Sequence, residues 1–120
     1  MTATHSAKFV MRAMVEMFDT GDDGRAEAIV SAHYVDHQGL GTGEILGVDG
    51  FRHVVRVARS GYTELDVVIE DLIADGDRVV ARLTWRGTRP DGELVHRETI
   101  DIVRVESGLA IEHWGSRILP

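Results

Sequence analysis

The order of apolar and polar residues divides the chain into a helical first half and a β-rich second half. Apolar residues recur at helical spacing over residues 8–20, 25–32 and 50–60, which predicts three amphipathic helices. Asp49 stands before the third of these segments and is expected to cap that helix. Residues 39–47 contain four glycines, so we expect a loop between the second and third helices.

From residue 62 onward, apolar residues alternate with polar ones, as in strands with one buried face. This alternation predicts four strands, over residues 65–73, 78–87, 95–105 and 109–118. Helices followed by a meander of strands are typical of an α+β domain, in which the helices pack on one face of a curved antiparallel sheet. We expect the whole chain, 1–120, to form one such domain, with a cone-shaped space between the helices and the sheet.

Two residues in the last predicted strands point to chemistry. Asp101 interrupts an apolar strand, and His113 stands beside Trp114 in the next one. Because a buried carboxylate costs several kcal/mol unless it is paired or neutralised, we expect a pocket that holds both side chains. One of the two would act as the base and the other would orient it, in either assignment. The structural alternatives are a carboxylate bonded to an Arg or Tyr, and an imidazole packed against a backbone carbonyl.

Further residues complete the predicted site. The cone layout brings the segment after the second helix to the pocket mouth, where His37 is a third candidate catalytic residue. Arg117 shares a strand face with His113, so it is expected to bind a carboxylate or enolate oxygen of the substrate. The other predicted substrate-binding residues are Tyr34, Asp36, Trp85 and Trp114.

Composition narrows the class of partner. The net charge of −7 argues against nucleic acid and anionic membranes, which bind cationic surfaces. The chain has no cysteine, so disulfides and thiolate chemistry are excluded. It contains neither an apolar run of membrane-spanning length nor the apolar region of a signal peptide, so a cytoplasmic protein is expected. We predict no metal site.

Four segments resemble the SnoaL-like polyketide cyclase family, within the nuclear-transport-factor-2-like (NTF2-like) superfamily. They are Tyr-Val-Asp-His at 34–37, Gly-Phe at 50–51, the hairpin at 70–80 and the strand pair at 101–114. The resemblance implies a cone-shaped α+β fold with three N-terminal helices packed on a curved antiparallel sheet. It also implies a homodimer and an enzyme that needs no cofactor. Such enzymes close the last ring of an aromatic polyketide by intramolecular aldol condensation, in antibiotic biosynthesis.

The chain departs from the cyclases at two positions. They carry their acid–base Asp directly after the residue that matches Trp114, where this chain has Gly115. They also carry a pocket His where this chain has Asp101. Family members from anthracycline pathways that are associated with ring hydroxylation lack the cyclase Asp as well.

The resemblance therefore leaves three functions open. The first is aldol-type cyclisation, or a related ring modification, of a hydrophobic polycyclic substrate. The second is anthracycline-type ring hydroxylation, or support of a partner oxidoreductase that performs it. The third is non-catalytic binding of a small hydrophobic ligand.

Overall fold

The computed structural model describes residues 5–38 and 43–118. These residues form three helices, α1 (Ala7–Thr20), α2 (Ala26–Ile29) and α3 (Gly47–Arg59), and six strands. The strands are β1 (Val30–Asp36), β2 (Ile45–Leu46), β3 (Glu64–Asp75), β4 (Arg78–Thr88), β5 (Leu94–Glu106) and β6 (Leu109–Ile118). None of the helices in these two ranges is long and apolar enough to cross a membrane.

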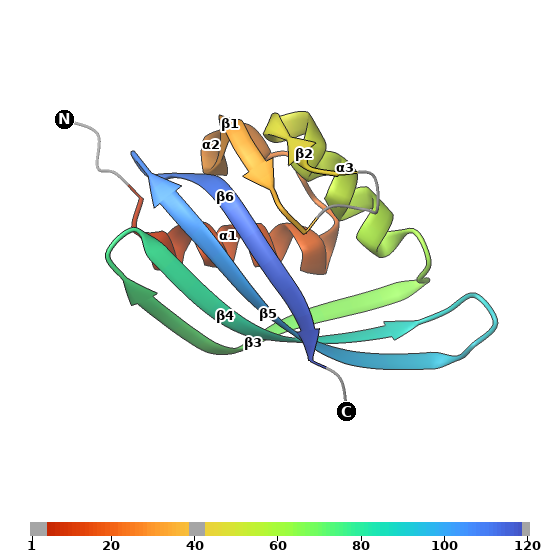
Figure 1. The fold of residues 1–120 in the computed structure, drawn as a ribbon. Coiled ribbons are helices and arrows are strands. Elements are labelled where there is room, and N and C mark those ends of the chain that lie inside the picture. The colour runs from red at the N-terminus through yellow and green to blue at the C-terminus, as the bar shows by residue number, and fades with distance from the viewer. Residues whose placement is uncertain (1–4, 39–42, 119–120) are drawn as a thin grey trace.

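The strands form one sheet in the order β2-β1-β6-β5-β4-β3. Strand β1 runs parallel to β6, and the other neighbouring pairs are antiparallel. The long strands curl beneath α1 and α3, which lie on the concave side of the sheet (Figure 1). This arrangement confirms the predicted α+β class, with helices packed on one face of a curved sheet.

The segment predicted as the second helix, 25–32, is only partly helical. Helix α2 ends at Ile29, and the chain continues directly as β1, which pairs with β6. Backbone hydrogen bonds to β6 and burial of β1 side chains outweigh the helical spacing of this short segment. The predicted four-strand meander corresponds to β3–β6, and β1 and β2 extend it to six strands.

Two further details of the first half differ from the prediction. Helix α3 begins at Gly47, so the prediction that Asp49 caps it is wrong. Asp49 lies in the first turn instead, where its negative charge faces the positive end of the helix dipole. Of the predicted loop 39–47, residues 39–42 lie outside the described part of the chain, and Ile45–Leu46 is strand β2.

The apolar core lies between α1 and the concave face of the sheet. Val79, Ala81 and Leu83 of β4 are buried on that face, as the alternation predicted, and Val10 and Met14 of α1 are buried in the same core. Removing a side chain of this kind from water contributes roughly 1.5–3 kcal/mol. The core therefore fixes which face of each strand points toward the helices.

The C-terminal end of α1 is tied to two other elements. The carboxylate of Asp19 accepts a hydrogen bond from the backbone N–H of Val67 in β3 at 2.8 Å. Arg59 of α3 donates to the carbonyl oxygens of Phe18 and Asp19 at 2.6 and 2.8 Å. The two bonds from Arg59 satisfy carbonyl groups that the helix end leaves unpaired, and the bond to Val67 ties this end of α1 to β3.

The outer face of the sheet carries an apolar row that crosses four strands. Ile73, Val80, Ile102 and Trp114 are successive partners in the strand register, and Ile73 is 63% exposed. The homodimer expected from the family resemblance would bury this row, and it stays a prediction.

Candidate active site

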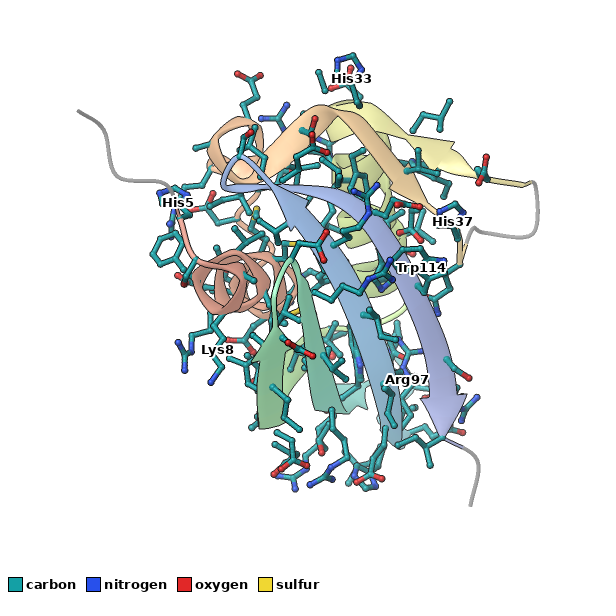
Figure 2. All side chains as sticks on the ribbon, turned by 60° about the vertical axis from the view of Figure 1, so that its left-hand side comes forward. His5, Lys8, His33, His37, Arg97 and Trp114 are labelled. Carbon is teal, nitrogen blue, oxygen red and sulfur yellow. The ribbon has the colours of Figure 1, made fainter. Side chains whose placement is uncertain are left out.

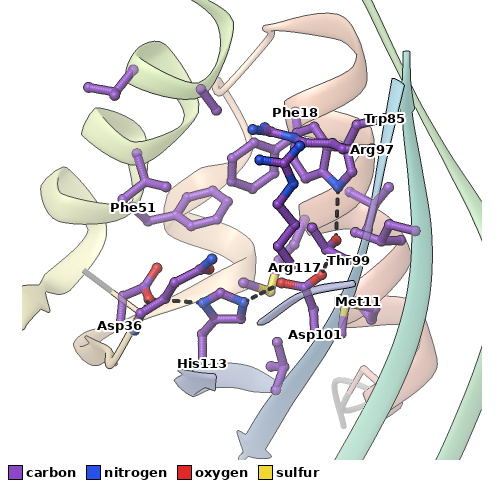
Figure 3. Close-up of a pocket in the computed structure, with 18 of the residues that line it drawn as sticks. Met11, Phe18, Asp36, Phe51, Trp85, Arg97, Thr99, Asp101, His113 and Arg117 are labelled. Carbon is purple, nitrogen blue, oxygen red and sulfur yellow. Dashed lines mark hydrogen bonds and ion pairs between the residues drawn. The ribbon is translucent and has the colours of Figure 1, made fainter. Parts of the chain in front are cut away.

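A cavity of about 500 Å³ lies between α1, α3 and the concave face of the sheet. This volume is within the range of pockets that bind small organic molecules, roughly 300–1,000 Å³. Most of its wall is apolar, and its aromatic members are Phe18, Tyr34, Phe51, Tyr62 and Trp85. The polar groups gather on the sheet side (Figure 3).

On that side, an imidazole stands between two carboxylates. His113 Nδ1 lies 2.9 Å from Asp36 Oδ1, and His113 Nε2 lies 2.7 Å from Asp101 Oδ1 (Figure 3). The side chains are 12%, 4% and 12% exposed for His113, Asp36 and Asp101. We call these three residues the Asp–His–Asp cluster. It joins strands β1, β6 and β5, so its geometry depends on the sheet.

The strand register explains how the cluster forms. Asp36 of β1 is the direct partner of His113 in the parallel β1–β6 pair. Asp101 of β5 is the partner of Gly115 in β6, which places His113 diagonally across from it on the same face. The turn between β5 and β6 reverses the chain, with φ angles of 53° and 78° at Ser107 and Gly108, as a tight two-residue hairpin turn requires. A β-bulge next to Val105 then shifts the register by one residue, and this shift brings Asp101 and His113 to the same face of the sheet.

Each carboxylate is held by further hydrogen bonds. Asp101 Oδ2 accepts from the Thr99 hydroxyl at 2.7 Å, and Thr99 accepts from the indole N–H of Trp85 at 2.9 Å. Asp36 accepts from the backbone N–H of Gln38 at 3.0 Å and from the Tyr34 hydroxyl at 3.3 Å. The rotamers of both acids are therefore fixed before any ligand binds.

The electrostatics of the cluster favour a charged imidazole. Burial opposes the charge on His113, but hydrogen bonds to Asp101 and Asp36 and their negative charges outweigh it and raise its pKa from 6.5 to about 9. Burial likewise opposes the charge on Asp36, yet the bond and the positive charge of His113 lower its pKa. Burial and the nearby Asp36 raise the pKa of Tyr34 well above its usual value. At neutral pH, His113 is an imidazolium that donates to an acid from each ring nitrogen.

Gly115 is required by the space that the cluster leaves. A Cβ at this position would lie 2.6 Å from Gln38 Oε1 and 2.7 Å from Asp101 Oδ1. The side chain of Gln38 is exposed and can shift, whereas Asp101 is buried and bonded to His113 and Thr99. A side chain at 115 therefore competes with the Asp101 carboxylate for one place.

The structure brings most of the predicted site residues to the cavity. Its lining includes Tyr34, Asp36, Trp85, Asp101, His113 and Arg117.

His37 and Trp114 lie elsewhere, which corrects their prediction as cavity residues. Trp114 follows His113 on β6 and so points to the opposite face of the sheet, where it stacks on His37 with ring centroids 5.2 Å apart (Figure 2). His37 follows Asp36 and turns away from the cavity, and its ring nitrogens contact Glu112 and Glu44, each at 2.7 Å.

Arg97 and Thr99 line the cavity, and neither was among the predicted site residues. The guanidinium carbon of Arg97 lies 4.9 Å from the ring centroid of Trp85. The signal was present in the sequence, because residues 97, 99 and 101 share one face of a strand. The pairing of Asp36 with His113 had no such signal, since it depends on contact between β1 and β6.

Solved structures of similar fold place this geometry among known proteins. A proposed polyketide cyclase from Bacillus cereus is 26% identical, with a TM-score of 0.81 over 91% of this chain and 72% of its own. IdmH, a proposed polyketide cyclase from Streptomyces antibioticus, is 20% identical, with a TM-score of 0.82 over 94% of this chain and 92% of its own. AclR, a proposed hydroxylase from Streptomyces galilaeus, is 19% identical, with a TM-score of 0.75 over 90% of this chain and 75% of its own.

These likenesses confirm the NTF2-like cone fold. No curated protein matches the sequence. The family model described as SnoaL-like polyketide cyclase matches residues 8–117, which is nearly the whole chain. The chain therefore belongs to the SnoaL-like polyketide cyclase family.

Proposed function

We propose that this protein is a cofactor-independent acid–base enzyme that modifies an aromatic polyketide by ring closure or a related reaction. The observation that carries the proposal is the Asp–His–Asp cluster, a buried imidazole held between two carboxylates at the wall of an apolar cavity. Titratable groups with perturbed pKa values in a cleft are typical of catalytic sites. Family membership supports the same conclusion at the level of substrate class.

Asp101 is the group best placed to act as the base. Asp36 accepts three hydrogen bonds, from His113, Gln38 and Tyr34, and its side chain is 4% exposed. Asp101 accepts two, from His113 and Thr99, and its side chain is 12% exposed. Asp101 is thus the less enclosed of the two acids and the one better placed to reach a substrate, and Asp36 acts as a positioning residue that keeps His113 charged.

The reaction follows from this arrangement. A flat substrate lies among the aromatic side chains of the cavity, and Asp101 removes a proton from a carbon beside a carbonyl group. The imidazolium of His113 stabilises the enolate charge that develops, which is effective because the site is largely shielded from water. The enolate carbon attacks a second carbonyl carbon of the same molecule, a carbon–carbon bond forms, and the new alkoxide takes the proton back from Asp101.

Isotope exchange tests the proton transfer without knowledge of the natural substrate. The protein is incubated in D₂O with a tricyclic aromatic β-dicarbonyl compound, and deuterium incorporation beside the carbonyl is followed by NMR. We expect exchange well above the buffer rate with wild type and with Asp66→Asn, a control that removes an exposed outer-face carboxylate. Binding of the compound without any acceleration of exchange would count against the enzyme.

Gly115 offers a second test, because it stands where the family's cyclases carry their acid. We expect Gly115→Asp to lower exchange at least about 10²-fold, since the new side chain displaces the Asp101 carboxylate. Ser116→Asp, on the opposite face of β6, is the matched control and should retain activity.

The swapped variant Asp101→Gly/Gly115→Asp should recover part of the loss, because the carboxylate then occupies the same space from the other strand. Wild-type activity in Gly115→Asp alone would show that position 115 and Asp101 do not compete.

Ring hydroxylation is the second candidate, and Gly115 favours it, because family members associated with hydroxylation also lack the cyclase Asp. The same enolate would react with oxygen, and a partner oxidoreductase would supply the electrons. Mass spectrometry separates the two outcomes. Ring closure gives an isomer of the substrate, or that isomer less water, whereas hydroxylation adds one oxygen atom.

A further inference from the structure

Two arginines lie in the cavity beyond the Asp–His–Asp cluster. Arg117 is the register partner of Thr99, and Arg97 lies two residues before Thr99 in β5, on the same face. Both side chains extend away from His113 toward Phe18 and Trp85 (Figure 3). The cavity therefore holds the Asp–His–Asp cluster at one end and two arginine side chains at the other.

The charge of these arginines is not matched within the described part of the chain. Neither Arg97 nor Arg117 forms an ion pair with a carboxylate of residues 5–38 or 43–118, whereas Arg89, which also lines the cavity, contacts Glu93 at 3.1 Å. Arg97 Nε is the single buried side-chain nitrogen or oxygen of those residues that lacks a hydrogen-bond partner. A buried donor left in this state costs about 1–3 kcal/mol, so the described part of the protein does not fully satisfy this guanidinium.

The position of Arg97 suits one kind of ligand group. Its guanidinium lies against the face of the Trp85 ring, and Phe18 packs edge-on against the same indole. The stack restrains the plane of the guanidinium, and a planar fork of N–H donors matches the two oxygens of a carboxylate. A neutral ester would leave the charge uncompensated.

We propose that the substrate is a free aromatic polycyclic carboxylic acid, whose carboxylate is bound by Arg97 and Arg117 while its reacting carbonyl lies against Asp101. This inference rests on the proposed function, since it names the substrate class of the same cavity. The two arginines bind and orient the substrate, and the proton transfer belongs to the cluster.

Binding of a matched acid and ester tests the proposal. Anthraquinone-2-carboxylate and its methyl ester are titrated into the wild-type protein by isothermal calorimetry. We expect the acid to bind at least about 10-fold more tightly, with an affinity that falls as salt is raised. Equal affinity for the two compounds, including no measurable binding of either, would overturn the proposal, and this comparison needs no variant.

Variants then assign the effect to residues. We expect Arg97→Gln to weaken binding of the acid about 10- to 100-fold and to leave the ester unchanged. Arg97→Lys keeps the positive charge but not the planar pair of N–H donors, so we expect an intermediate loss of affinity for the acid. Arg86→Gln is the control, because Arg86 is an exposed arginine on the outer face of β4. An equal loss of acid and ester in Arg97→Gln would show a packing role and would also overturn the proposal.

The two proposals fail in different ways. Arg97-dependent binding of the acid, combined with isotope exchange that does not depend on Asp101, would reject the catalytic proposal and keep this one. Exchange that depends on Asp101, combined with equal binding of acid and ester, would do the reverse.

Discussion

Replacing Asp101 with Asn is expected to lower isotope exchange and turnover by about 10²- to 10⁴-fold, the usual contribution of a general acid–base group. The amide has the shape of the carboxylate, so its oxygen still accepts the hydrogen bond from His113, and its NH₂ group faces the Thr99 hydroxyl oxygen, which can accept from it. It cannot take a proton from carbon, and it no longer neutralises the imidazolium. The chemistry is lost while the cavity keeps its form.

The same variant should bind a cavity ligand within about 3-fold of wild type, because the substitution leaves the aromatic wall and Arg97 untouched. Calorimetry measures the binding, and Asp66→Asn controls for loss of a carboxylate elsewhere. Full activity in Asp101→Asn would reject this residue as the base.

Replacing His113 with Gln is expected to lower the free energy of unfolding by about 3–5 kcal/mol near pH 6. The substitution removes the cation from between two buried carboxylates and leaves both without a charge partner. Urea unfolding followed by fluorescence measures the loss. His113→Gln/Asp36→Asn should recover part of it, since one of the two repelling charges is then gone. A loss below about 1 kcal/mol would mean that a charge on His113 contributes little to the stability of the fold.

The stability of wild type should depend on pH in a way that this variant lacks. The pKa of His113 is raised from 6.5 to about 9, so its stabilising effect is complete below about pH 6.5 and disappears as pH rises through 9. The pKa of Asp36 is lowered from 3.8, so its contribution is present above that value and is lost as pH falls below it. Wild type should therefore lose stability between about pH 6.5 and 9, whereas His113→Gln should lose much less over that interval.

Local patterns in the sequence were sufficient to predict the second half of the fold. The alternation along β4 predicted that one face of the strand is buried, and Val79 and Ala81 are buried on that face. A strand face follows from a period of two residues, and the Gly-containing turns mark where the hairpins reverse, although bulges in β3–β4 and β5–β6 shift the register within the strands. These signals lie within short stretches of chain and need no knowledge of distant contacts.

The first half was less predictable, because its structure depends on contacts between distant residues. Val30–Asp36 carries helical spacing at its start, yet it becomes a strand because β6 is available to pair with it. That parallel pairing sets Asp36 against His113 and directs His37 away from the cavity. Asp36 and His113 could therefore be predicted as site residues from the sequence, but the contact between them could not.

The proposed chemistry depends on the charge state of His113, which NMR of its labelled ring nitrogens measures directly as pH is varied. A ring held by both Asp36 and Asp101 should keep its proton to a midpoint near pH 9 in wild type, and to a lower midpoint in Asp101→Asn. A wild-type midpoint at or below the ordinary value of 6.5 would mean a neutral buried imidazole, and would contradict the proposed site.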